Sequence, residues 1–184
     1  AAHGLRIGTI ADLIRYRAAN ESLVERICTR RVMTPAGEFE LIAYRDQPSG
    51  AAHLALLHGT LTPDHEALVR VHEPLSVLDV LEIQASTHAW PLLKALERIA
   101  RSDGGVLVML NCGEASEDLF ARLDAITSGT AEVARSTTVD LRTYGVGAQI
   151  LRDLGVRRMK LLAKPRKMPS MAGFGLQVTG YLED

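Results

Sequence analysis

Five consecutive apolar residues, Val106 to Leu110, constrain the fold of this 184-residue chain more than any other segment. A strand with one face in water alternates apolar and polar residues, whereas an unbroken apolar run is typical of a strand covered on both faces. The preceding stretch, 91–99, has apolar residues at helical spacing and a proline that suits a first helical turn. We therefore expect a sheet with helices packed against it.

The first half of the chain has the pattern of short strands joined by turns. Residues 24–33 favour a strand that ends at the turn Thr34 to Gly37, and residues 39–44 would return beside it. Two further strand patterns follow at 53–58 and 67–72. We interpret this half as a β-meander.

The second half mixes helices and strands. A helix is expected to start near Ser116 with Phe120 facing inward, and another spans 145–154 before a terminating glycine. Strand patterns at 159–162 and 175–181 complete the chain. The expected fold class is mixed α+β, with an N-terminal β-meander and a mixed sheet flanked by helices.

A short helical pattern precedes the first strand. Thr9 is expected to cap this helix, and apolar residues follow at near-helical spacing, namely Ile10, Leu13, Ile14 and Tyr16. The segment is short and separate from the next pattern. We predict a linker helix over residues 1–21 and one domain over residues 22–184.

Charge and composition exclude several classes of function. The formal net charge is −1, which provides no general electrostatic attraction to nucleic acid or to an anionic membrane. The longest apolar runs are too short to span a bilayer, and the first residues lack a signal-peptide pattern. Two cysteines, Cys28 and Cys112, do not indicate a disulfide framework. We expect a cytoplasmic protein.

Three stretches carry a family resemblance: His3 to Arg17, Val69 to His72, and Tyr144 to Leu151. They resemble the GTP cyclohydrolase II domain of bifunctional riboflavin-biosynthesis proteins. In those proteins this domain follows a 3,4-dihydroxy-2-butanone 4-phosphate synthase domain, and the first stretch resembles the junction. The resemblance implies a mixed-sheet α/β fold, a homodimer and a synthase domain as partner.

The zinc site of that family falls on unsuitable residues in this chain. The family holds zinc with a Cys-x10-Cys-x-Cys pattern soon after Arg-Val-His, and the corresponding positions hold Leu75, Ser86 and His88. Thiolates bind zinc tightly, and an open fourth position activates water. Leucine cannot ligate, and one histidine cannot hold the ion. We expect no metal and no other cofactor.

The family's nucleotide loop is also altered. At the corresponding place the chain has Cys112 to Leu119, which lacks the family's arginine and contains three acids. Acidic side chains repel a triphosphate, so this segment is unsuited to GTP.

Some catalytic and GTP-contacting positions of the family remain. Asp140 and Arg142 match the family's Asp-x-Arg, to which general-base and nucleophile-like roles are assigned. Arg70, His72 and Lys167 match GTP-contacting residues. Four of these five residues have a structural alternative: an ion pair or helix start for Asp140 and Arg142, a core histidine for His72, and a solvated basic loop for Lys167.

These observations predict a catalytically degenerate GTP cyclohydrolase II-like domain that dimerises, stabilises or modulates the synthase. Catalysis by an assembled site is strongly non-additive, so a few surviving groups without the metal should not sustain the reaction. Two alternatives remain open: a cyclohydrolase or nucleotide hydrolase that uses an altered site, and a nucleotide sensor without turnover.

Overall fold

The structure is a computed structural model built around one seven-stranded mixed sheet. The structure describes residues 9, 10, 12, 13, 16, 21–73, 90–113, 115–117, 119, 120, 141–165 and 171–183. For residues 141 and 142 it describes only the backbone.

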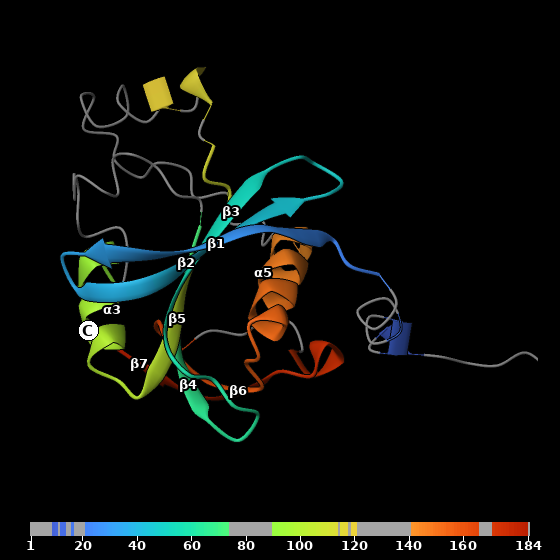
Figure 1. Ribbon diagram of the computed structural model, residues 1–184. Coiled ribbons are helices and arrows are strands. Elements are labelled where there is room, and N and C mark those ends of the chain that lie inside the picture. The colour runs from blue at the N-terminus through green and yellow to red at the C-terminus, as the bar shows by residue number, and fades with distance from the viewer. Residues whose placement is uncertain are drawn as a thin grey trace, which may run out of the picture.

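The sheet has the strand order β1-β2-β3-β5-β4-β6-β7 (Figure 1). Its antiparallel part comprises β1 (Val24–Thr34), β2 (Gly37–Asp46) and β3 (Ala52–Gly59). β3 pairs antiparallel with β5, which begins the parallel part. The parallel strands are β4 (Glu66–His72), β5 (Gly104–Met109), β6 (Arg158–Leu162) and β7 (Gln177–Leu182).

The predicted meander is confirmed for the first three strands and is wrong for the fourth. β5 inserts between β3 and β4, and β4 runs parallel to β5. Most residues of β4 and all six of β5 are buried, so neither strand could lie at an edge with a wet face. The unbroken apolar run therefore marks the centre of the sheet.

Helices cover both faces of the sheet, as Figure 1 shows. α3 (Leu92–Ala100) packs on one face and buries Ala95, Leu96 and Ile99 against the sheet. α5 (Leu141–Asp153) packs on the opposite face, together with the short 3-10 helix η2 (Met171–Phe174). Within the part of the chain that is described, no helix is long and apolar enough to cross a membrane.

α5 begins earlier than the sequence pattern predicts and ends at Asp153, one residue before the predicted end at Leu154. Thr143 is buried and Tyr144 packs against the core, so tertiary contacts extend the helix towards its N-terminus. At the other end, Gly155 has a φ of 90°. Its N–H bonds Arg152 O at 3.1 Å, and the N–H of Val156 bonds Leu151 O at 3.0 Å. These two bonds form a Schellman cap, which favours glycine.

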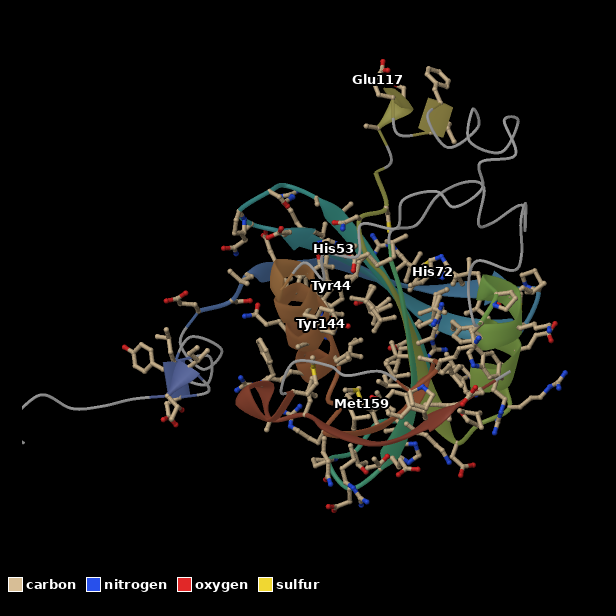
Figure 2. All side chains as sticks on the ribbon, turned by 180° about the vertical axis from the view of Figure 1, so that it is seen from behind. Tyr44, His53, His72, Glu117, Tyr144 and Met159 are labelled. Carbon is tan, nitrogen blue, oxygen red and sulfur yellow. The ribbon has the colours of Figure 1, made fainter. Side chains whose placement is uncertain are left out.

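The expectation that Phe120 faces inward is wrong. The backbone at residues 116, 117, 119 and 120 is helical, but Phe120 is an exposed side chain. Figure 2 shows Glu117 of this segment well away from the sheet. The sheet therefore offers these residues no surface on which to bury an apolar face.

Two glycines of the core should respond to alanine in opposite directions. A Cβ on Gly105 would lie 2.4 Å from Leu68 O and 3.2 Å from Ile99 Cγ2, so Gly105→Ala should destabilise the fold by about 2 kcal/mol or more. Gly145 lies inside α5 with its nearest neighbour, Phe174 Cζ, at 3.9 Å. Gly145→Ala should stabilise the protein by about 0.5–1 kcal/mol. Urea unfolding measures both changes, and shifts of the same sign would contradict this packing.

Candidate functional site

The carboxyl ends of β4, β5 and β6 meet at one edge of the sheet, because the three strands are parallel. The chain passes from β4 to β5 through α3 on one face, and enters β6 from α5 on the other face. In the sheet, β4 lies between β5 and β6. The connection that leaves β4 runs over the α3 face to β5, whereas the connection that enters β6 runs over the α5 face. The two connections therefore part between β4 and β6. Ligands of open α/β sheets bind at such a switch point, outside the carboxyl ends of the strands.

Arg70 and His72 lie at this edge, on the same face of β4. Both side chains are buried, and Figure 2 shows His72 on the α3 side of the sheet. Arg70 Nη1 donates a hydrogen bond to Leu162 O at 3.0 Å. The guanidinium therefore ties the last residue of β6 to β4. Arg70 therefore stabilises the pairing of these strands through the main chain of β6.

Trp90 makes a comparable contact one strand further out. Its Nε1 donates to Leu182 O at 2.8 Å, and its ring is buried in the apolar cluster under α3. Trp90 directly precedes Pro91, the N-cap residue of α3. Trp90 and Arg70 together satisfy carbonyl groups at the carboxyl ends of β6 and β7, where parallel strands leave polar groups that need partners.

The other predicted site residues lie outside what the structure describes. The placement of Asp140 and Lys167 is not described, nor is that of the family zinc positions Leu75, Ser86 and His88. The backbone of Arg142 belongs to the first turn of α5, whereas its side chain is not described. The structure therefore brings together Arg70 and His72 and does not test the remainder of the predicted site.

A polar cluster that the sequence analysis missed joins three strands at the same edge. Asn111, just beyond β5, has a φ of 53°. Its main-chain N–H donates to His53 Nδ1 at 3.0 Å, and its Nδ2 donates to Glu73 Oε1 at 3.1 Å. Asparagine tolerates left-handed backbone better than most residues. An asparagine directly after a buried strand was the available signal for this turn.

The His53 ring is held neutral by its surroundings. Nδ1 accepts the Asn111 N–H, so the ring proton of the neutral form must be on Nε2. Burial lowers the pKa of His53, while the charge of Asp46 acts in the opposite direction. Asp46 itself accepts a hydrogen bond from Ser49 Oγ. Protonation of Nδ1 would break the bond to Asn111, so the cluster requires the uncharged imidazole.

Cys112 follows Asn111 and is not prepared for nucleophilic chemistry. Its thiol donates to Met109 O at 3.4 Å, and burial raises its pKa. A thiol with a raised pKa is neither a good nucleophile nor a ready metal ligand. Among the described residues, no group of three or more His, Cys, Asp or Glu side chains could hold a metal ion.

Comparisons with known proteins place this edge in a family context. Residues 25–183 match the family model described as GTP cyclohydrolase II. A protein named 3,4-dihydroxy-2-butanone 4-phosphate synthase from Neisseria meningitidis serogroup A is 44% identical over 181 residues, which cover 98% of this chain and 48% of the relative. Riboflavin biosynthesis protein RibBA of Aquifex aeolicus is 42% identical over 185 residues, which cover 96% of this chain and 46% of that protein.

A solved structure is also similar to this chain over its whole length. It is the crystal structure of RibBX, a two-domain 3,4-dihydroxy-2-butanone 4-phosphate synthase from A. baumannii, with 37% identity and a TM-score of 0.61. The match covers 100% of this chain and 47% of that one. The chain thus spans about half the length of the curated relatives it matches.

The structural role of Arg70 can be measured as stability. Arg70→Met should lower the free energy of unfolding by about 2 kcal/mol, because Leu162 O loses a charged donor in a buried setting. Arg98→Met is the matched control, since Arg98 is exposed on α3 and should change stability by less than about 0.5 kcal/mol. Chemical denaturation of both variants measures the difference, and equal effects would contradict the role assigned to Arg70.

His53 should make the protein less stable in acid. Its pKa is lower in the folded chain than in the unfolded chain, so on acidification the unfolded chain takes up the proton first. The contribution of His53 is complete above the ordinary histidine range and is lost as the pH falls through about 6.5, by at most about 1.4 kcal/mol per pH unit. His53→Asn retains an acceptor near Nδ1. This variant should flatten the plot of unfolding free energy against pH between about pH 7 and 5, measured by chemical denaturation at each pH. Parallel profiles for the two proteins would refute this assignment.

Proposed function

The chain belongs to the GTP cyclohydrolase II family, and we propose that this domain supports a 3,4-dihydroxy-2-butanone 4-phosphate synthase without itself converting GTP. The observation that carries the proposal is the residue set at the family zinc positions, Leu75, Ser86 and His88. Leucine offers no donor atom and serine is a poor zinc ligand, so this set lacks the thiolates that hold the ion.

The described cysteines do not supply the missing thiolates. Cys112 hydrogen-bonds Met109 O and its pKa is raised, which disfavours the thiolate. Cys28 lies on β1, at the edge of the sheet, whereas β4 and β5 occupy its centre. The residues present therefore do not fit zinc, and we derive no reaction step through it.

The two described residues that match GTP contacts support the same conclusion. Arg70 and His72 are both buried, and Arg70 donates to the Leu162 carbonyl. Recognition of a triphosphate requires cations that the phosphates can reach. A guanidinium already bonded to the main chain in the core contributes to stability and is poorly placed for an incoming anion.

The relatives indicate the partner. Proteins that are 44% and 37% identical to this chain are named 3,4-dihydroxy-2-butanone 4-phosphate synthase, and the latter is described as a two-domain protein. We propose that this domain is a homodimeric, non-catalytic unit that stabilises or regulates such a synthase domain in the same protein. Its function would then depend on its surfaces rather than on the edge of the sheet.

The proposal predicts different outcomes for two activities of the full-length protein. With zinc and GTP it should release no formamide or pyrophosphate, while a family member with the three cysteines serves as positive control. Removal of residues 22–184 should lower the rate of the synthase reaction, the thermal midpoint of the synthase domain or the number of copies that associate. The reason is that the stabilising unit is lost.

Two results would contradict this function. Formamide release above background that is abolished by Arg142→Ala would show a working, altered cyclohydrolase. Unchanged synthase rate, thermal stability and oligomeric state after removal of residues 22–184 would exclude a supporting role. Calorimetry with GTP identifies the remaining alternative, a nucleotide sensor, as binding without turnover.

A further inference from the structure

The turn after β5 is closed by a bond to a titratable nitrogen. The main-chain N–H of Asn111 donates to His53 Nδ1, whereas in most turns the acceptor is a carbonyl oxygen. A carbonyl oxygen accepts a hydrogen bond at any pH near neutrality. A histidine nitrogen accepts only while the ring is neutral, because both ring nitrogens are donors in the imidazolium. The closure of this turn is therefore linked to the protonation state of one side chain.

Protonation would replace this hydrogen bond with a contact between two donors. Nδ1 of His53 and the main-chain nitrogen of Asn111 lie 3.0 Å apart, so N–H groups on both atoms would point at each other. The His53 side chain is 2% exposed, so water cannot take the place of the lost acceptor while the ring stays where it is. The imidazolium and the closed turn therefore exclude each other, and either the ring or the turn must move.

The backbone of Asn111 favours movement of the turn. Its φ of 53° lies in the left-handed region, which residues with a side chain rarely adopt. Two contacts hold it there: the bond to His53, and the bond of 3.1 Å from Asn111 Nδ2 to Glu73 Oε1. Asn111 thus joins β3, the end of β4 and the chain that follows β5. Loss of the imidazole acceptor leaves the left-handed conformation with half of this support.

β2 offers the charged ring a different partner. Tyr44 pairs with His53 across β2 and β3, and Asp46 lies two residues further along β2, on the same face. Burial lowers the pKa of His53, while the charge of Asp46 acts in the opposite direction and favours the imidazolium. Asp46 is 4% exposed and accepts a hydrogen bond from Ser49 Oγ, so its carboxylate is held in place. The neutral and the charged ring therefore have different partners.

The other described groups around the imidazole keep their charge on mild acidification. Burial raises the pKa of Tyr44 on β2 and that of Cys112 after β5, so both stay neutral. β1 contributes Arg26, which lies over the Tyr44 ring and forms an ion pair with α5. α5 contributes Tyr144, which Figure 2 shows on the same side of the sheet, and the end of β4 contributes Glu73. Histidine has the ordinary pKa nearest to neutral, so the imidazole changes charge first.

We propose that His53, Asn111 and Glu73 form a proton-sensitive latch on the chain that follows β5. With a neutral imidazole the latch is closed and fixes the direction in which this chain leaves the sheet. Protonation of Nδ1 breaks the bond to Asn111, moves the imidazolium towards Asp46 and releases Asn111 from its left-handed conformation and from Glu73. The segment beyond the latch, which Figure 2 shows at Glu117 well away from the sheet, then changes direction while β5 stays folded. The latch does not rest on the proposed function.

Hydrogen exchange of the unsubstituted protein tests the latch. The N–H of Asn111 should exchange through a local opening, so low urea should not change its rate, whereas the buried amides of β5 should respond to urea through global unfolding. After correction for the intrinsic effect of pH on exchange, opening at Asn111 should be about fivefold or more as frequent at about pH 5.5 as at about pH 7. The reason is that the released ring takes up a proton at its ordinary pKa. Opening that is independent of pH, or that responds to urea as β5 does, would overturn the proposal.

Two histidine variants on the same strand form a matched pair. His53→Asn keeps an acceptor and cannot take up a proton in this pH range, so the pH dependence of exchange at Asn111 should disappear. His58→Asn changes the other histidine of β3, which lies near the far end of the strand with its Nδ1 3.5 Å from Glu38 O. This control should retain the pH dependence. The same behaviour in both variants would show that His53 is not the proton-binding group and would refute the latch.

The tautomer of His53 provides a readout that needs no substitution. With the latch closed, the imidazole ¹⁵N signals should show the proton on Nε2 at neutral pH, because Nδ1 accepts the N–H of Asn111. As the ring is protonated, the amide signal of Asn111 should shift with the same midpoint. A proton on Nδ1 at neutral pH, or a ring that titrates without any change at Asn111, would contradict the inference. Formamide release and the synthase rate do not enter these measurements, so the latch and the proposed function can fail independently.

Discussion

The structure depends on burying β4 and β5 between two helices. Every residue of β5 and most of β4 are inaccessible to water, and the apolar clusters under α3 and α5 meet at these strands from opposite faces. Parallel strands joined by crossover helices, such as β4 and β5, are usually buried on both faces. The antiparallel hairpins extend the sheet from β5 through β3, so their register also depends on the central pair. Gly105 allows this arrangement because its missing side chain leaves room for Leu68 O.

The same burial determines what the carboxyl edge of the sheet can do. Parallel strands end here with polar groups, and in this chain protein side chains satisfy several of them: Arg70 reaches Leu162, Trp90 reaches Leu182, and Asn111 links His53 to Glu73. A buried polar network of this kind is costly to disturb, because each partner removed leaves another group unsatisfied. The described side chains at this edge therefore contribute to the stability of the sheet.

The sequence predicted those features that depend on local periodicity. The five-residue apolar run, the turn at Thr34 to Gly37 and the glycine cap after α5 are each decided by neighbouring residues, and the structure has them in these places. The position of β4 was not predictable in this way, since a strand pattern does not specify which strand lies beside it. The cluster around Asn111 joins residues far apart in sequence, so it could be found only once the topology was known.

α5 connects the edge of the sheet to the segment that leads into β1. α5 starts with the backbone of Arg142, a match to the family's catalytic pattern, and near its other end it carries Gln149 and Asp153, which hold the entry into β1. Asp153 accepts a hydrogen bond from Tyr44 and forms an ion pair with Arg26. These contacts are made by an amide that bonds the main chain and by a carboxylate that bonds a buried tyrosine, so they do not depend on a ligand at the edge of the sheet.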